Sequence, residues 1–139
     1  MEFVTSNNKK KVVINTASFR EMNALKKEAM KCIQQIADAG LLDNVKDLST
    51  ATALDAIIKV LISADTSPDF EKALFDCLKH CLYDEFYAIN EKLFEDKPEA
   101  IEDYYEIVAK CVEENLRPFF KSLVTAFNTN LQKLNINQQ

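Results

Sequence analysis

Apolar residues recur every three or four positions along most of this chain, a spacing that gathers them on one face of a helix. The first such stripe predicts a helix from Ser18 to about Ala39. Ser18 and Glu21 have the spacing of a capping box, in which each side chain binds a free N–H at the helix start. Gly40 suits the left-handed position that ends many helices. The apolar positions of this helix are Phe19, Met22, Leu25, Ala29, Cys32, Ile33 and Ile36.

Two further stripes predict a second helix from about Ser49 or Thr50 and a third helix that opens at residues 67–69. Ser67 can cap the third helix, Pro68 fits its first turn and Asp69 suits the positive end of the helix dipole. The apolar positions are Ala53, Leu54, Ile57, Ile58, Leu61 and Ile62 in the second helix, and Phe70, Leu74, Cys77, Leu78 and Cys81 in the third.

A second capping-box pattern, Asp96 with Glu99 around Pro98, predicts the start of a fourth helix. Pro118 has no backbone N–H, so we expect it to interrupt the helix near residues 115–117. The predicted apolar positions are Ile101, Tyr104, Tyr105, Val108, Cys111 and Val112 before the proline, and Phe119, Phe120, Leu123, Val124, Phe127, Leu131 and Leu134 after it.

Strand signals are weak. Residues 1–11 are polar and predicted to be irregular, while the β-branched run at 11–15 can form one short strand with residues 86–90. A helical turn competes with a strand in residues 83–95. The predicted fold is mainly α: a single-domain helical bundle of about four to five helices, with flexible ends at 1–10 and 135–139.

Composition and charge agree with a helical protein that avoids nucleic acids. The chain is 47% hydrophobic and has one glycine and three prolines, too few for many β-turns. Its net charge is -5, and residues 83–116 hold 11 acidic against 3 basic side chains. This surface would repel a phosphate backbone, and the three lysines at 9–11 are too few to reverse that.

Membrane insertion and export are not expected. Val12–Ile14 is followed by polar residues rather than by the apolar core of a signal peptide. Leu54–Leu61, interrupted by Asp55 and Lys59, is far shorter than the ~20 apolar residues that span a bilayer. We therefore expect a cytoplasmic protein.

Catalytic chemistry is not indicated, because the chain has one histidine and lacks both a glycine-rich phosphate loop and a serine-nucleophile motif. Cys77, His80 and Cys81 share a helix face and could bind a metal. However, Cys32 and Cys111 lie on other helices, and structural zinc takes four ligands. Buried, reduced thiols are the favoured interpretation. We predict no enzyme activity, no cofactor and no metal site.

Two segments carry a family resemblance: VVINTASFREMNALKKEAMK at residues 12–31 and IEDYYEIVAKCVEENLRPFFKSL at residues 101–123. Together they resemble tail assembly chaperones of long-tailed (siphovirus-type) bacteriophages or prophages of Gram-positive bacteria. Cys81–Tyr83 and Leu93–Glu95 are similar to elements of the same family. Residues 84–90 are longer than the brief turn that the resemblance implies.

The resemblance implies a protein that binds the phage tape-measure protein, keeps it soluble and helps to recruit tail-tube subunits. It also implies residence in the host cytosol, absence from the mature virion and a longer form of the chain made by ribosomal frameshifting. The candidate partner-binding residues are Phe119, Phe120, Leu123 and Phe127, for which core packing is the competing interpretation. Self-association is left open.

Two other classes of protein compete with a chaperone. An acidic helical adaptor or inhibitor would bind a basic partner through residues 83–116, with strongly salt-sensitive affinity. A phage head–tail structural subunit would form a closed ring and remain in the particle.

Overall fold

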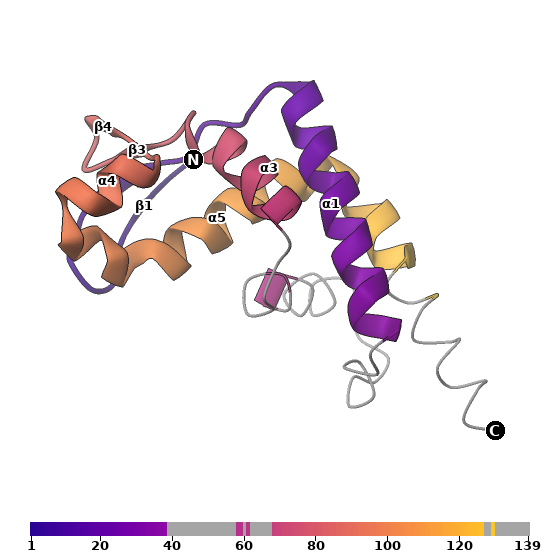
Figure 1. Ribbon diagram of the computed structural model, residues 1–139. Helices are drawn as coiled ribbons and strands as arrows, with labels where there is room; N and C mark the ends of the chain where they lie inside the picture. Colours follow the sequence, from indigo (N-terminus) through magenta and orange to yellow (C-terminus); the bar gives the residue numbers. More distant parts are fainter. Residues whose placement is uncertain (39–57, 60, 62–67, 127–128, 130–139) are drawn as a thin grey trace.

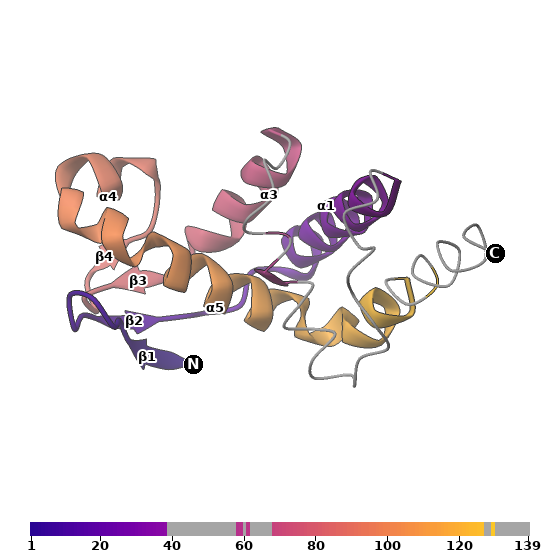
Figure 2. The same cartoon turned by 90° about the horizontal axis from the view of Figure 1, so that it is seen from below.

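A small antiparallel sheet and a set of helices form the part of the chain that the computed structural model describes, residues 1–38, 58–59, 61, 68–126 and 129 (Figure 1). Figure 2 shows α4 and α5 on one side of the sheet. The elements are β1 (Glu2–Val4), β2 (Lys11–Val13), α1 (Phe19–Asp38), α3 (Pro68–Leu78), β3 (Leu82–Tyr83), β4 (Tyr87–Ala88), α4 (Glu91–Asp96), the 3₁₀ helix η1 (Pro98–Asp103), α5 (Tyr104–Leu116) and the 3₁₀ helix η2 (Arg117–Phe119).

The sheet is larger than the predicted single pair of strands. Its order is β1-β2-β3-β4, and each neighbouring pair is antiparallel. The predicted pairing of residues 11–15 with 86–90 is wrong, because β3 lies between β2 and β4. The irregular conformation predicted for residues 1–11 is wrong as well, since residues 2–4 pair with β2. Flexibility of residues 1–10 stays a prediction.

The turn after β3 explains why β4 pairs with β3 and not with β2. Asp84 and Glu85 have positive φ angles of 53° and 69°, so the chain reverses immediately after Tyr83. Non-glycine residues in this region carry some strain. Here Glu85 N–H donates to the Lys11 carbonyl at 3.2 Å, and Lys11 Nζ lies 3.3 Å from Glu85 Oε1. The turn is thus held against β2, and β4 follows on the outer side of β3.

The fourth predicted helix is divided into η1 and α5, and the predicted cap at Asp96 is wrong, because Asp96 is the last residue of a separate short helix, α4. Asn90 caps α4, accepting a hydrogen bond from Leu93 N–H at 3.0 Å, and Lys97 N–H closes α4 on the Leu93 carbonyl. Pro98 then starts η1, which leads into α5. The interruption at Pro118 is confirmed, because α5 ends at Leu116, η2 covers the proline, and residues 120–126 are helical again.

The core forms where α1, α3 and α5 pack on one another, and it continues to buried residues of the sheet such as Val12 and Tyr83. Most predicted stripe positions are buried there, including Leu25, Ile33, Phe70 and Val112. The mainly helical class is confirmed. Three stripe positions are wrong: Phe19, Ile101 and Tyr105 are 73%, 58% and 53% exposed. Phe19 and Tyr105 are the first and second residues of α1 and α5, and Ile101 lies in the short 3₁₀ helix η1.

Several predicted features lie outside the described residues. They are the C-cap at Gly40, the cap at Ser67, the positions Phe127, Leu131 and Leu134, the C-terminal residues 135–139 and most of the second helix. From that helix the structure describes Ile58, Lys59 and Leu61, all in helical conformation.

One buried polar cluster ties the N-terminal hairpin to the start of α5. Asp103 is fully buried, and its Oδ2 accepts hydrogen bonds from Tyr83 Oη at 2.8 Å and from Asn8 Nδ2 at 3.0 Å. Its Oδ1 has no hydrogen-bond partner in the described part of the chain. Burial and the neighbouring Asp103 carboxylate raise the pKa of Tyr83, so its hydroxyl stays a donor.

Replacing Tyr83 with phenylalanine should therefore destabilise the fold. Tyr83→Phe leaves Asp103 Oδ2 with Asn8 as its one remaining donor among the described residues, and we expect the free energy of unfolding to fall by about 1–3 kcal/mol. Urea denaturation followed by circular dichroism measures this. Tyr105→Phe removes the hydroxyl of an exposed tyrosine and is the matched control. Equal effects of the two substitutions would contradict the role assigned to the buried cluster.

Candidate partner-binding surface

Aromatic rings from distant parts of the sequence meet beside the N-terminus of α1. The rings of Phe19 and Phe119 lie 6.4 Å apart between centroids and are tilted by 46°, and Lys26 Nζ lies 5.6 Å from the centroid of Phe119. Phe119 and Phe120 are each partly buried, whereas Phe19 is 73% exposed. We call Phe19, Phe119 and Phe120 the aromatic surface. This surface exposes apolar side chains to solvent next to the ammonium group of Lys26.

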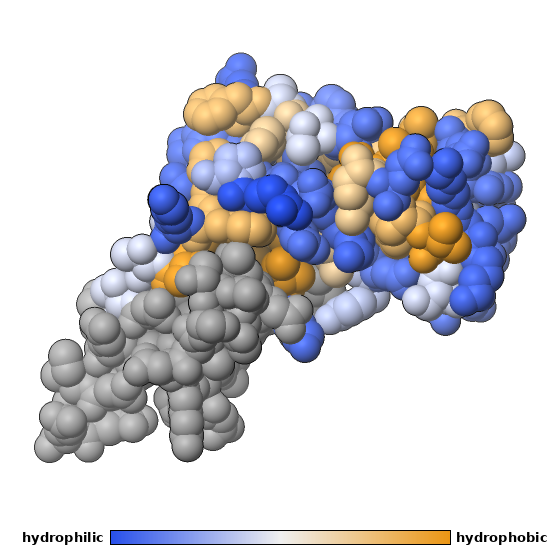
Figure 3. Space-filling view, turned by 180° about the vertical axis from the view of Figure 1, so that it is seen from behind, coloured by the Kyte–Doolittle hydropathy of each residue, from blue (hydrophilic) through white to orange (hydrophobic). Residues whose placement is uncertain are grey.

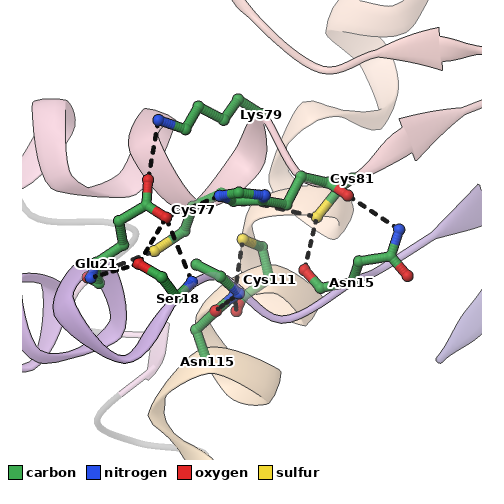
Figure 4. A network of polar contacts seen from close by, with 10 residues as sticks. Asn15, Ser18, Glu21, Cys77, Lys79, Cys81, Cys111 and Asn115 are labelled. Atoms are coloured by element: carbon green, nitrogen blue, oxygen red, sulfur yellow. Dashed lines mark hydrogen bonds and ion pairs between the residues drawn. The ribbon is translucent and has the colours of Figure 1, made fainter.

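A capping network holds Phe19 in place at the start of α1, and Figure 4 shows its members converging on Glu21. Glu21 N–H donates to Ser18 Oγ at 3.2 Å, while Ser18 N–H and Oγ both donate to Glu21 Oε1, at 3.3 and 2.9 Å. This confirms the predicted capping box. Phe19 follows the cap directly, so the network fixes where its side chain leaves the helix.

The same carboxylate joins α1 to the end of α3. Lys79 Nζ lies 2.9 Å from Glu21 Oε2, and His80 Nε2 lies 2.8 Å from Glu21 Oε1. The hydrogen bond from Lys79 lowers the pKa of Glu21 to about 2, against the opposing effect of burial, and His80 and Ser18 add to the lowering. Glu21 is therefore ionised at neutral pH and pairs with the Lys79 ammonium.

A second anchor is buried and positions Phe119. The side chain of Asn115 is fully buried; its Oδ1 accepts the Ala17 N–H at 2.9 Å, and its Nδ2 donates to the Cys111 carbonyl at 2.9 Å. The residue just before the cap of α1 is thereby fixed to the last turn of α5, from which η2 continues. The hydrogen bond between Ala17 and Asn115 therefore brings together the segments that carry Phe19 and Phe119.

The structure separates the residues that the sequence singled out. Leu123 is 1% exposed and packs in the core, so it supports Phe119 and Phe120 without facing solvent. Phe127 lies outside the described residues. Sequence reasoning missed Phe19, because its stripe position suggested burial. Its place directly after the N-cap Ser18, at the end of the stripe, was the available signal.

The cysteines are core residues. All four are free and buried, as predicted. Burial raises the pKa of Cys77 to about 12, which keeps its thiol protonated and poorly nucleophilic at neutral pH. Across the described residues, no group of three or more His, Cys, Asp or Glu side chains is arranged to hold a metal ion. Nor does any helix there have the length and apolar character to cross a membrane.

Comparison with known proteins gives one match. The family model described as phage tail assembly chaperone protein, TAC, matches residues 8–128, which is most of the chain. The chain belongs to this family. The matched segment contains the aromatic surface, the capping network and Asn115. Searches of curated proteins and of solved structures gave no match.

Membership establishes the general role, tail assembly chaperone, with phage tail proteins as partners. It agrees with the resemblance drawn from residues 12–31 and 101–123. The Gram-positive host and the siphovirus type remain predictions.

The pH dependence of stability tests the capping network. The folded-state pKa of Glu21, about 2, lies below its ordinary value of 4.5, so its charge stabilises the fold above pH 4.5. That contribution is lost as the pH falls from 4.5 towards 2. At pH 7 we expect Glu21→Gln to lower the free energy of unfolding by about 1 kcal/mol, and near pH 2 we expect no difference.

Glu102→Gln is the control for this experiment, since the Glu102 side chain is exposed and makes no ion pair within the described residues. Chemical denaturation at several pH values compares the two variants with the unaltered chain. A deficit in Glu21→Gln that stays constant from pH 7 to pH 2 would show that the charge of Glu21 is not what stabilises the fold.

Proposed function

We propose that this tail assembly chaperone binds the phage tape-measure protein through the aromatic surface, keeps that protein soluble and helps to recruit tail-tube subunits during tail assembly. The observation that carries the proposal is the Phe19–Phe119 pair, held by two polar anchors while Phe19 remains 73% exposed. Phe86 is more exposed, at 80%, but Phe19 meets a second aromatic ring, and together the two rings offer a larger apolar area for a partner to cover.

The chemistry of this surface suits an apolar helical stripe. Burying one aromatic side chain removes about 150–250 Å² from water, and aromatic anchors dominate the energy of many protein interfaces. Phe119 already has part of its surface in the core, so little ordering entropy is lost when a partner packs on it. Lys26, which lies over the Phe119 ring, can meet an acidic residue beside the stripe.

The remaining parts of the proposed role are inferred from membership of the tail assembly chaperone family. We infer that the chaperone acts in the cytosol of the host, leaves before the virion is complete, and has a longer form produced by ribosomal frameshifting. Phe127 and Phe120 are proposed to extend the contact beyond Phe19 and Phe119, with Leu123 supporting it from the core. Mass spectrometry of purified virions separates this role from that of a structural subunit, which would remain in the particle.

Co-expression with the tape-measure protein tests the binding surface. We expect the intact chain to keep the partner soluble and to co-purify with it. Phe19→Ser combined with Phe119→Ser should reduce the co-purified partner by about tenfold or more, the effect of losing two aromatic contacts. Because Phe119 is partly buried, Phe19→Ser alone is measured as well; it removes an exposed ring and leaves the core intact.

Phe86→Ser with Tyr105→Ser is the matched control, since it removes two exposed aromatic side chains elsewhere, which are 80% and 53% exposed. This pair should leave co-purification unchanged. The proposed surface is wrong if the control pair and the Phe19 variants lose the partner equally. The proposed function is wrong if the intact chain neither solubilises nor retains it.

A further inference from the structure

A groove with both apolar and acidic lining residues lies where α3, α4, η1 and the start of α5 meet, and its residues are separate from the aromatic surface. Its volume is about 380 Å³. The floor is formed by Phe75, Phe94, Ile101 and Tyr104. Phe94 and Tyr104 pack edge to face, with ring centroids 5.2 Å apart and an interplanar angle of 89°, and Ile101 is 58% exposed. The groove therefore presents four apolar side chains to solvent beside polar lining groups.

Carboxylates surround this floor. Glu71 of α3 and Glu91 and Glu95 of α4 line the groove, and all three are exposed. None of them takes part in an ion pair within the described ranges. The pKa of Tyr104 is raised, first by burial and second by the negative charge of Glu71, so this carboxylate acts on a residue that lines the groove. A hollow that adjoins the groove beside Phe75 contributes one basic residue, Lys92.

We propose that this acidic groove binds a basic amphipathic helix of a partner protein. Helix-in-groove recognition places apolar side chains at i, i+3, i+4 and i+7 on an apolar floor. Lysine and arginine residues flanking that stripe would face Glu71, Glu91 and Glu95, which have no cationic partner among the described residues. Such complementarity selects a basic helix over an acidic one and speeds the encounter.

The shape of the groove argues against other occupants. The elements that line it are helical, so no open strand edge is available for an extended peptide to join. Phosphate groups would meet three carboxylates and are disfavoured. The inference uses different residues from those of the proposed function, so either can fail without the other.

A labelled helical peptide tests the groove in the full-length chain. The probe has about 15–20 residues, long enough to form a helix, with leucine at i, i+3, i+4 and i+7 and with lysine and arginine on the flanks. Fluorescence anisotropy measures its dissociation constant. We expect Glu71→Gln, Glu91→Gln and Glu95→Gln together to weaken binding by about tenfold and to reduce its dependence on salt. Ile101→Asp should weaken binding by a similar factor.

Matched controls separate the groove from general attraction to an acidic protein. Glu99→Gln with Glu102→Gln and Asp69→Asn removes the same charge from exposed carboxylates outside the groove, and Tyr105→Asp alters a side chain about as exposed as Ile101. Both should change affinity less than about twofold. A scrambled peptide of the same composition should bind at least about tenfold more weakly, because it lacks the apolar stripe.

Several results would overturn the proposal. Equal losses in the groove variants and their controls, or equal binding of the scrambled peptide, would mean non-specific charge attraction. Sedimentation provides a further test: if the chain alone self-associates and Ile101→Asp, but not Tyr105→Asp, makes it monomeric, then a second copy occupies the groove instead of a partner helix. The co-expression assay with the Phe19 variants is read independently of all these outcomes.

Discussion

The buried hydrogen bond from the Ala17 N–H to the Asn115 side chain is the constraint on which the arrangement depends. A buried amide without partners is costly, and Asn115 is satisfied when the link between β2 and α1 lies against the last turn of α5. That placement sets the start of α1 beside η2. Glu21 then binds Ser18 at the start of α1 and Lys79 and His80 at the end of α3, so α1, α3 and α5 meet at one polar junction (Figure 4).

The junction lies next to both rings of the proposed binding surface, Phe19 and Phe119. Phe19 and Phe119 are 100 positions apart in sequence, yet each lies within four positions of a residue of the junction. Pre-organised apolar groups lose less entropy when a partner binds. Figure 3 shows from behind that hydrophobic surface is interspersed with hydrophilic surface. Exposed apolar groups in small, charge-separated patches let a chaperone bind hydrophobic segments without precipitating itself.

Features of the sequence that act over a few residues were predictable. The capping box at Ser18 and Glu21 needs one turn of helix, Pro118 interrupts a helix wherever it occurs, and a thiol within an apolar stripe is buried with the stripe. The errors arose where the outcome depended on distant residues. Asp96 and Glu99 have the spacing of a cap, but Asn90 had already started α4, and Pro98 then began a 3₁₀ turn. Residues 11–13 do form a strand, but β1 and β3, rather than residues 86–90, are its neighbours.

By itself, the sequence determined the mainly helical class, the break at the proline, the acidic character of residues 83–116 and the resemblance that the family match supports. These properties depend on periodicity, on single residues or on composition, all of which are local. The tertiary structure decided the order of the strands, the exposure of Phe19 beside Phe119, the burial of Leu123 and the gathering of three carboxylates and four apolar side chains in one groove. An apolar stripe looks the same whether it meets the core or solvent. Which side chains remain uncovered depends on where the neighbouring elements end, and contacts between distant residues set those positions.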